Sequence, residues 1–283
     1  MRWAGGRQSD NVEDRRGISV PLVAGGGIGT VVLVLLALFF GVDPSVILQT
    51  GSPEVRPAPV EAPSASPRTA DPGREFVSVV LADTEDTWGE IFTKMNREYQ
   101  RPKLVLFTGS VQSACGMAGA ATGPFYCPGD HKLYLDLSFF REPHQRFRAP
   151  GDFAEAYVIA HEVGHHVQTL LGITDKVAAS RSRATRVEAN ALSVRTELQA
   201  DCFAGIWAHN ADSTRHILES GDVEEGLNAA AAIGDDRLQK QTTGRVSPES
   251  FTHGTSAQRV AWFKRGLSSG ELRQCDTFVA AKP

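Results

Sequence analysis

Residues 152–172 read DFAEAYVIAHEVGHHVQTLLG, and this stretch decides how the chain around it folds. Apolar residues recur in it at intervals of three and four, which is the spacing of one face of an α-helix. Asp152 suits the N-cap of that helix, and Gly172 suits its C-terminal stop. We therefore predict one helix across this stretch, with the segment HEVGH at residues 161–165 on it.

His161 and His165 are one helical turn apart, so their imidazoles project from the same side of the predicted helix. Both rings can then reach one ion, and H-E-x-x-H on a helix is a pattern that binds zinc in metallopeptidases. Glu162 would flank the ion closely enough to take a proton from a water that zinc has made more acidic. The alternative is that the two histidines are only hydrogen-bonded on a helix face. His166 falls on a different face, and we expect it in a pocket wall or beside a ligand rather than as a ligand itself.

A catalytic zinc normally takes three protein ligands and leaves one position for water, so a third ligand must come from elsewhere. No histidine follows His165 at the spacing of the metzincin pattern. Glu197, on a second predicted helix, is the best candidate. Asp201 follows one turn later and would hydrogen-bond the free ring nitrogen of a ligand histidine. Glu188 and His209 remain alternative ligands, and a solvated helix face remains the alternative for the two carboxylates.

Residues 18–42 carry no charge, and residues 31–40 read VVLVLLALFF, which is long enough to cross a bilayer as part of a helix. Four arginines precede this run, whereas no lysine or arginine follows it before Arg56. The positive-inside rule then puts residues 1–17 in the cytoplasm. We expect a single-pass protein of the cell membrane whose catalytic domain is extracytoplasmic. A cleaved signal peptide is the alternative.

Six prolines between residues 53 and 72 alternate with alanine, serine and small polar residues. This composition does not bury enough surface to fold, so we interpret residues 43–74 as a Pro-rich linker. Residues 75–283 are then one domain. Its fold class is predicted as α+β, a small sheet followed by a helical majority, preceded by the transmembrane helix and the linker. Strands are expected at 104–107 and 132–137, and helices at 76–99, 186–209, 222–239 and 255–267.

Four cysteines lack the paired spacing of a structural zinc site, and an extracytoplasmic location permits disulfides. Three connectivities are possible. We expect Cys115 to pair with Cys127, closing a glycine-rich loop, and Cys202 to pair with Cys275, fixing the C-terminal segment to a helix. Free buried thiols are the alternative.

The charge balance excludes one class of partner. The chain of 283 residues has 29 Lys and Arg against 33 Asp and Glu, a formal net charge of -4. Nucleic-acid binding requires a clustered positive surface, which this balance does not favour. We therefore expect a peptide or protein substrate, contact with the membrane and no nucleic acid.

Several segments resemble the bacterial family named putative neutral zinc metallopeptidase. They are the opening MRW, NVEDRRG at 11–17, FYCPGD at 125–130, HEVGHH at 161–166 and ELQADCFAG at 197–205, so the resemblance covers nearly the whole chain. It implies a zincin-like domain with a gluzincin-type site and Zn2+ as cofactor. His161 and His165 correspond to the helix ligands, Glu162 to the general base and Glu197 to the third ligand. The resemblance supplies no substrate.

Residues 253–259, HGTSAQR, resemble more loosely the C-terminal His-and-Arg segment of membrane-associated gluzincins. His253 would then stabilise the developing oxyanion. An equal alternative is that Thr255 or Ser256 caps the last helix and His253 is a loop residue. Tyr126 or Tyr134 would suit the same role.

The sequence thus predicts a membrane-anchored zinc metallopeptidase in which Glu162 acts on the attacking water. By analogy with zincins, the strand at 132–137 would align an extended peptide by strand addition. One alternative is a non-catalytic, zinc-stabilised extracytoplasmic binding module. Another is an envelope structural protein without metal.

Overall fold

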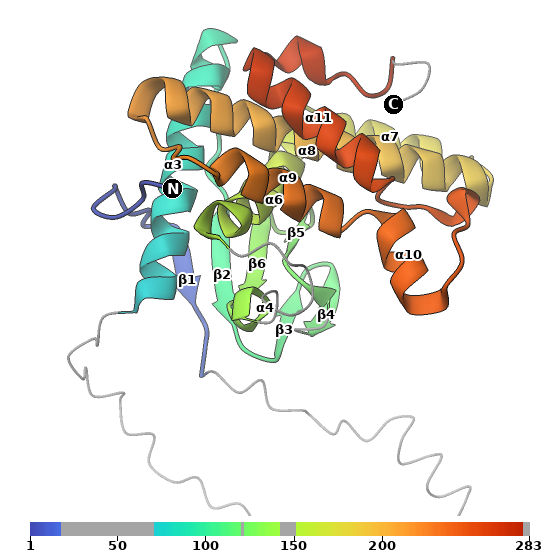
Figure 1. Ribbon diagram of the computed structural model, residues 1–283, viewed down its shortest axis with the longest axis horizontal. Coiled ribbons are helices and arrows are strands. Elements are labelled where there is room, and N and C mark those ends of the chain that lie inside the picture. Colours follow the sequence, from blue (N-terminus) through green and yellow to red (C-terminus); the bar gives the residue numbers. More distant parts are fainter. Residues whose placement is uncertain (18–70, 120–121, 142–150, 280–283) are drawn as a thin grey trace, which may run out of the picture. The chain divides into compact units, whose positions relative to one another are not determined.

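The computed structural model describes residues 1–17, 71–119, 122–141 and 151–279 (Figure 1). Met1–Ile18 and Asp71–Pro283 form one compact unit. The predicted transmembrane helix at 18–42 and nearly all of the predicted linker lie outside the described residues. The remaining predictions on element boundaries can be compared directly with the structure.

A four-stranded sheet has the order β1-β2-β6-β5, with bounds Val12–Asp14, Lys103–Phe107, Lys132–Asp136 and Phe125–Cys127. β1, β2 and β6 run parallel, and β5 runs antiparallel to β6 at the edge. The strand predicted to align a substrate, β6, is therefore interior, with a partner on each side. β5 is the edge strand next to β6, and its three residues were too few to give a strand pattern in the sequence.

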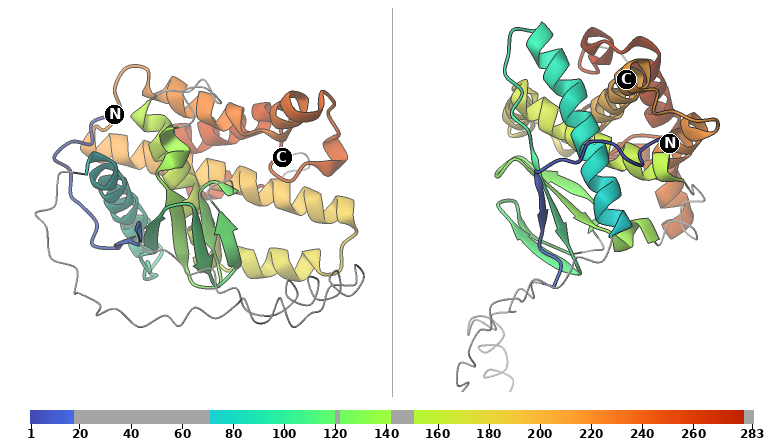
Figure 2. Two further views of the ribbon diagram at one scale, coloured as in Figure 1. Left: turned by 90° about the horizontal axis from the view of Figure 1, so that it is seen from below. Right: turned by 90° about the vertical axis from the view of Figure 1, so that its left-hand side faces the viewer.

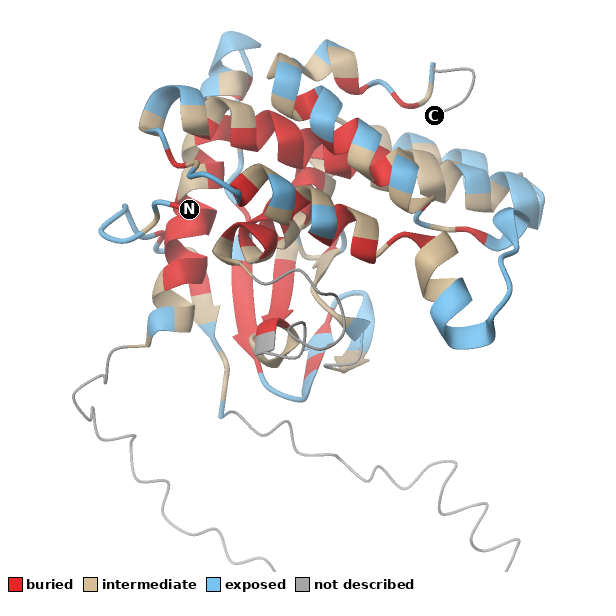
Figure 3. Ribbon diagram, in the orientation of Figure 1, coloured by how far each residue is buried: buried red, intermediate tan, exposed pale blue. Residues whose placement is uncertain are grey.

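Long helices build most of the core. α3 (Pro72–Lys94), α6 (Asp152–Leu170), α8 (Arg186–Arg215) and α11 (Ser256–Ser269) are the longest. Buried residues are concentrated on α3, α6, the middle of α8 and the strands β2 and β6 (Figure 3). Figure 2 shows the sheet on one side of the helical layer. The shorter elements are α4 (Ser138–Arg141), α7 (Ile173–Arg181), α9 (Asp222–Ala232), α10 (Asp235–Thr243), η2 (Pro248–Ser250) and η3 (Leu272–Cys275).

Local sequence sets most of the helix ends. α8 begins after a capping box in which Thr185 and Glu188 satisfy each other's backbone N–H groups, and Thr255 does the same with Gln258 at α11. The helix predicted at 222–239 is instead divided into α9 and α10. The division occurs at Gly234, where a Cβ atom would lie 2.3 Å from the backbone nitrogen of Ser256. Gly234 is in an extended conformation, and this contact with a residue distant in sequence leaves no room there for a larger side chain.

The predicted fold class needs correction. The structure is mostly helical, and an α+β class preceded by a transmembrane helix is not what it shows. The strands hold three to five residues each, so helix faces rather than sheets supply the core. Within residues 1–17, 71–119, 122–141 and 151–279, no helix has both the length and the apolarity needed to span a bilayer.

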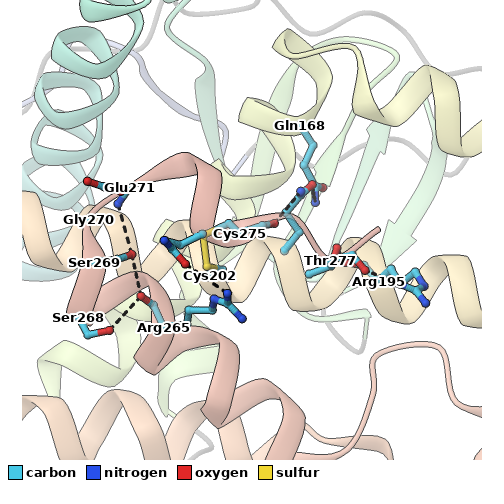
Figure 4. Close-up of a disulfide and its surroundings, with 12 residues drawn as sticks. Gln168, Arg195, Cys202, Arg265, Ser268, Ser269, Gly270, Glu271, Cys275 and Thr277 are labelled. Carbon is cyan, nitrogen blue, oxygen red and sulfur yellow. Dashed lines mark hydrogen bonds between the residues drawn. A yellow bond between two sulfur atoms is a disulfide. The ribbon is translucent and has the colours of Figure 1, made fainter. Parts of the chain in front are cut away.

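Both disulfides are those predicted from the sequence. Cys115 pairs with Cys127, and Cys202 pairs with Cys275. The first joins β5 to the turn between β3 (Ser110–Ser113) and β4 (Gly116–Gly119), which form a separate two-stranded sheet. The second fixes η3 to α8 (Figure 4). The alternative of free buried thiols is wrong.

The N-terminal segment 1–17 is part of the folded unit. β1 pairs with β2 in register, with Glu13 opposite Val105. The amino group of Met1 lies 2.5 Å from a carboxylate oxygen of Asp152 at the start of α6. Two strands that are hydrogen-bonded to each other lie on the same side of a membrane. Residues 1–17 and the domain are therefore on the same side of any membrane whenever β1 is paired with β2.

Glu13 links three strands and makes the sheet sensitive to acid. Its carboxylate lies 3.2 Å from the Lys103 amino group on β2, 3.2 Å from that of Lys132 on β6, and 2.5 Å from Arg15. Burial alone would raise the pKa of Glu13, but hydrogen bonds from these three cations outweigh burial and lower it to about 2. The ionised Glu13 carboxylate therefore stabilises the fold fully at pH values above its unfolded-state pKa of 4.5, and this stabilisation is lost as pH falls towards 2.

We expect Glu13→Gln to lower the free energy of unfolding by about 1 kcal/mol at pH 7, the upper end for a partly exposed ion pair. Urea unfolding from pH 7 to pH 2 should show the difference from wild type shrinking below pH 4.5. Glu90→Gln, an exposed change on α3, is the matched control. A difference that is constant with pH would contradict the role of the Glu13 charge.

Candidate metal centre

The helix α6 presents His161 and His165 one turn apart on the face that α8 covers. His161 is 5% exposed, and His165 is half-buried. The two ring centroids are 4.8 Å apart and the ring planes are perpendicular. This arrangement directs one nitrogen of each ring toward a common point, because residues at i and i+4 share a helix face.

The helix α8 crosses α6 closely enough to bring a carboxylate to that point. Gly164 is the contact: a Cβ atom there would lie 3.0 Å from the carbonyl oxygen of Ala200. Glu197, one turn before Ala200, then lies beside both rings. Its Oε2 is 3.2 Å from Nε2 of His161, and its Oε1 is 3.5 Å from Nε2 of His165.

These three side chains fit a tetrahedral zinc ion. Their donor atoms lie within 4.8 Å of one another. A zinc ion with ligands at about 2.0–2.1 Å in tetrahedral geometry places those ligands about 3.3 Å apart. Glu197 offers one carboxylate oxygen to each ring, and the two nitrogen–oxygen distances of 3.2 and 3.5 Å are close to that spacing. Two imidazoles and one carboxylate are also the donor set of catalytic zinc sites that keep a fourth position for water.

Asp201 orients His161 and is itself held by two further side chains. Its Oδ1 accepts the Nδ1–H of His161 at 2.9 Å and the hydroxyl of Tyr157 at 2.5 Å. Arg259 on α11 donates to both carboxylate oxygens at 2.8 Å. All four residues are buried. The network leaves Nε2 of His161 as the nitrogen that faces the candidate metal position.

Gln168 plays the same part for His165. Its Oε1 lies 2.9 Å from Nδ1 of His165, one helical turn along α6. Gln168 is 1% exposed, so its amide is buried. His165 therefore also turns its Nε2 toward Glu197.

The charges of the cluster are coupled. Burial alone would lower the pKa of His161, but hydrogen bonds to Asp201 and Glu197 outweigh it and raise the pKa to about 10. Burial would raise the pKa of Glu197, but the neighbouring His165 and His161 hold it well below its usual range. A metal ion would take the place of the protons between these groups, so metal binding should release protons.

Glu162 lies beside the cluster in a cavity of about 700 Å³. Burial raises the pKa of its carboxyl group above the usual range, with opposing effects from His165 and His161. The cavity is lined both by the cluster and by an apolar wall. Its apolar and aromatic lining residues are Pro124, Phe125, Tyr126, Pro128, Phe139, Tyr157, Val158, Ile233 and Leu238.

The comparisons with known proteins show the family of this chain. The family model described as "Putative neutral zinc metallopeptidase" matches residues 1–278. The chain belongs to this family. It is 52% identical over 288 residues to "Uncharacterized protein YpfJ" of Escherichia coli (strain K12), covering 98% of this chain and 99% of that protein. It is 40% identical over 256 residues to "Uncharacterized protein Rv2575" of Mycobacterium tuberculosis (strain ATCC 25618 / H37Rv), covering 87% and 86%. No solved structure matches significantly.

In this member of the zinc metallopeptidase family, the structure brings together four predicted residues: His161, His165, Glu197 and Asp201. It does not bring the alternative ligands near them. Glu188 caps the start of α8, and His209 bonds the carbonyl oxygen of Leu267 at 2.8 Å.

The three candidates for oxyanion stabilisation fall in different places. His253 and Tyr126 line the cavity, and His253 forms an ion pair with Asp235 at 3.2 Å. Tyr134 is not among the cavity-lining residues, and its hydroxyl donates to Asp130 at 2.7 Å. The alternative was that Thr255 or Ser256 caps the last helix and that His253 is only a loop residue. Its first half is confirmed, because Thr255 caps α11.

His166 is 1% exposed and is not among the residues that line the cavity, so it is not the wall residue that was expected; it packs behind Tyr126, which does line the cavity. Its Nε2–H donates to the carbonyl oxygen of Gln100 at 2.6 Å, and its Nδ1 lies 3.2 Å from the hydroxyl of Tyr126. Burial lowers its pKa to about 4, so the ring stays neutral near pH 7.

Sequence reasoning missed Tyr157, Gln168 and Arg259 as parts of the site. Helical spacing offered a signal for two of them. Tyr157 lies four residues before His161 and Gln168 lies three residues after His165, on the same helix. Arg259 stood in the quoted 253–259 segment, but nothing local tied it to Asp201.

Removing the third candidate ligand should release metal. We expect Glu197→Gln to weaken Zn2+ binding by more than about 100-fold, beyond the loss seen when only an outer hydrogen-bond partner is removed. Metal content after dialysis and competition with a chromophoric chelator measure this. Glu188→Gln on the same helix is the control and should keep wild-type affinity. Equal affinities for both variants would exclude Glu197 as a ligand.

Arg259 neutralises a buried carboxylate, so its loss should destabilise the fold. We expect Arg259→Met to lower the free energy of unfolding by about 3–5 kcal/mol, because Asp201 would remain buried without its cation. Urea denaturation measures the change. Lys264→Met, an exposed change on the same helix, should stay within about 0.5 kcal/mol of wild type. A small effect at Arg259 would show that Asp201 is not held by this ion pair.

Proposed function

We propose that the protein is a peptidase that hydrolyses peptide bonds with zinc held by His161, His165 and Glu197, and with Glu162 as general base. The observation that carries this proposal is the convergence of two imidazoles and one carboxylate, whose donor atoms lie within 4.8 Å of one another and so within reach of one zinc ion. Glu162 lies next to them in the same cavity. The family to which the chain belongs supports the same class of reaction.

Zinc, when bound, supplies a Lewis acid that polarises a carbonyl oxygen and lowers the pKa of water. The protein supplies the proton transfers. Glu162 takes a proton from the attacking water on a carboxylate oxygen and then delivers it to the nitrogen of the leaving amine. Its buried position supports this role, because a raised pKa makes the protonated carboxyl group easier to form.

We propose that the substrate lies in an extended conformation along β5. Phe125 and Tyr126 of this edge strand line the cavity, and a strand edge binds an extended peptide through main-chain hydrogen bonds. β5 therefore replaces β6 as the strand proposed to align the substrate. The apolar wall favours large apolar side chains next to the scissile bond.

His253 is proposed to donate to the substrate carbonyl oxygen. The hydrogen bond to Asp235 raises the pKa of its imidazole, against the effect of burial, which favours the protonated ring that can donate. Its position on the cavity wall supports the proposal.

A broad peptide-library digest with variants of Glu162 tests the function. We expect wild type to hold about one zinc ion and to cleave, and Glu162→Gln to hold zinc but cleave about 100- to 10,000-fold more slowly, the usual contribution of a general base. The readouts are metal content and mass spectrometry of the digest.

Glu155→Gln is the matched control, because Glu155 lies on α6 but does not line the cavity. It should cleave as wild type does. Equal cleavage by wild type and Glu162→Gln would show that the base is assigned wrongly. Zinc binding without any cleavage by wild type would favour the non-catalytic binding module.

A further inference from the structure

A chain of amide hydrogen bonds leads from His165 to the C-terminal segment. Nδ1 of His165 lies 2.9 Å from Oε1 of Gln168. The side-chain nitrogen of Gln168 is 3.1 Å from Oε1 of Gln199, and that of Gln199 is 2.9 Å from the carbonyl oxygen of Cys275. Gln168 and Gln199 are 1% and 5% exposed, so both amide side chains are buried. We call these two side chains the amide relay.

Backbone carbonyl groups fix the direction of the relay. A carbonyl oxygen can only accept, so the carbonyl of Cys275 requires the NH₂ group of Gln199 to point toward it. Gln199 must then present its oxygen to Gln168. Gln168 also donates to the carbonyl oxygen of Thr196 at 2.7 Å, which fixes its NH₂ group a second time. The oxygen of Gln168 therefore faces His165 as an acceptor, and Nδ1 of His165 carries the proton.

That proton position decides what His165 can bind. A neutral imidazole has one N–H donor and one nitrogen with a free lone pair. With the proton on Nδ1, the lone pair is on Nε2, which is the nitrogen 3.5 Å from Glu197. An imidazole protonated on Nε2 instead could not bind a metal ion there. The relay thus selects the tautomer that the candidate metal site needs.

The far end of the relay is fixed by the disulfide between Cys202 and Cys275. This bond joins η3 to α8 one turn after Gln199. Thr277 adds a hydrogen bond from its hydroxyl to the carbonyl oxygen of Arg195 at 2.7 Å, and Arg195 donates back to the carbonyl oxygen of Thr277. Figure 4 shows the disulfide with Gln168 and the Arg195–Thr277 contact near it. The carbonyl of Cys275 is therefore held in place against α8.

We propose that Gln168 and Gln199 are positioning residues for His165, and that the Cys202–Cys275 disulfide supports metal retention by holding the relay's last carbonyl group. This inference rests on the proposed function, because it concerns the same metal site. His161 does not depend on the relay, since its Nδ1 is bonded to Asp201. The relay acts on one of the two histidines only.

The test measures Zn2+ affinity of the full chain by competition with a chromophoric chelator. Gln168→Met removes the acceptor at similar size, and we expect it to weaken binding about 10- to 100-fold. We expect Gln199→Met to weaken binding less, by up to about 10-fold, because Thr196 still orients Gln168. The absorption spectrum of the Co2+-loaded protein is a second readout, since altered geometry at His165 changes it whereas a general loss of stability does not.

A double-mutant cycle separates the relay from a general effect of the disulfide on stability. Replacing Cys202 and Cys275 by alanine should weaken Zn2+ binding as Gln199→Met does, and should have no further effect in the Gln168→Met background. Replacing Cys115 and Cys127 by alanine is the matched control, because that disulfide joins β5 to the turn between β3 and β4 and is not part of the relay. It should leave the affinity unchanged.

Two results would overturn the inference. One is a Zn2+ affinity of Gln168→Met within two-fold of wild type with an unchanged Co2+ spectrum. The other is that replacing Cys202 and Cys275 by alanine weakens Zn2+ binding by the same factor in wild type and in the Gln168→Met background. If either result is found while wild type binds zinc and cleaves peptides, the inference about the relay is wrong and the proposed function stands. If wild type binds no zinc, the proposed function fails as well.

Discussion

The close approach of α6 and α8 at Gly164 and Ala200 is the constraint on which the rest of the site depends. A side chain at residue 164 would press on the backbone of α8, so the two helices could not cross at this distance. His161 and His165 lie on either side of this contact on one helix, and Glu197 and Asp201 do so on the other. The packing of two helix backbones thus sets the positions of the donor atoms. Side chains on packed helices are held in more precise positions than side chains on loops.

The buried charges around Asp201 are tolerated because each has a partner within this frame. α11 packs against α8 with backbone in contact: a Cβ at Gly266 would lie 1.9 Å from the carbonyl oxygen of Cys202. Arg259 of α11 therefore reaches Asp201 from a fixed position. A buried ion pair adds little net stability against an apolar alternative, but removing one partner is costly. In this site the ion pair between Arg259 and Asp201 holds the carboxylate that orients His161.

Features that depend on residues close together in the sequence were predicted, and features that depend on residues far apart in the sequence were missed. The helix at 152–172 and the two histidines followed from spacing within one segment. Arg259 is 58 residues from Asp201, and the contact of Gly234 with Ser256 between α9 and α10 is also distant in sequence, so neither could be found by periodicity. β5 was missed because three residues give no alternation, and β6 was wrongly taken as the edge. Gln168 and Gln199 gained meaning only once their carbonyl partners were known.

The pairing of β1 with β2 constrains any account of where the chain lies in the cell. Glu13 binds Lys103 and Lys132, and Met1 binds Asp152, so residues 1–17 are joined to the domain by ladder bonds and ion pairs. The predicted arrangement put those residues in the cytoplasm and the domain outside it. A bilayer offers unpaired backbone groups no water, and a strand pair cannot extend across it. That arrangement therefore requires β1 to leave the sheet, with its N–H and C=O groups returned to water and the Glu13 ion pairs broken. The cellular location stays a prediction, and the ladder sets the structural condition that it must meet.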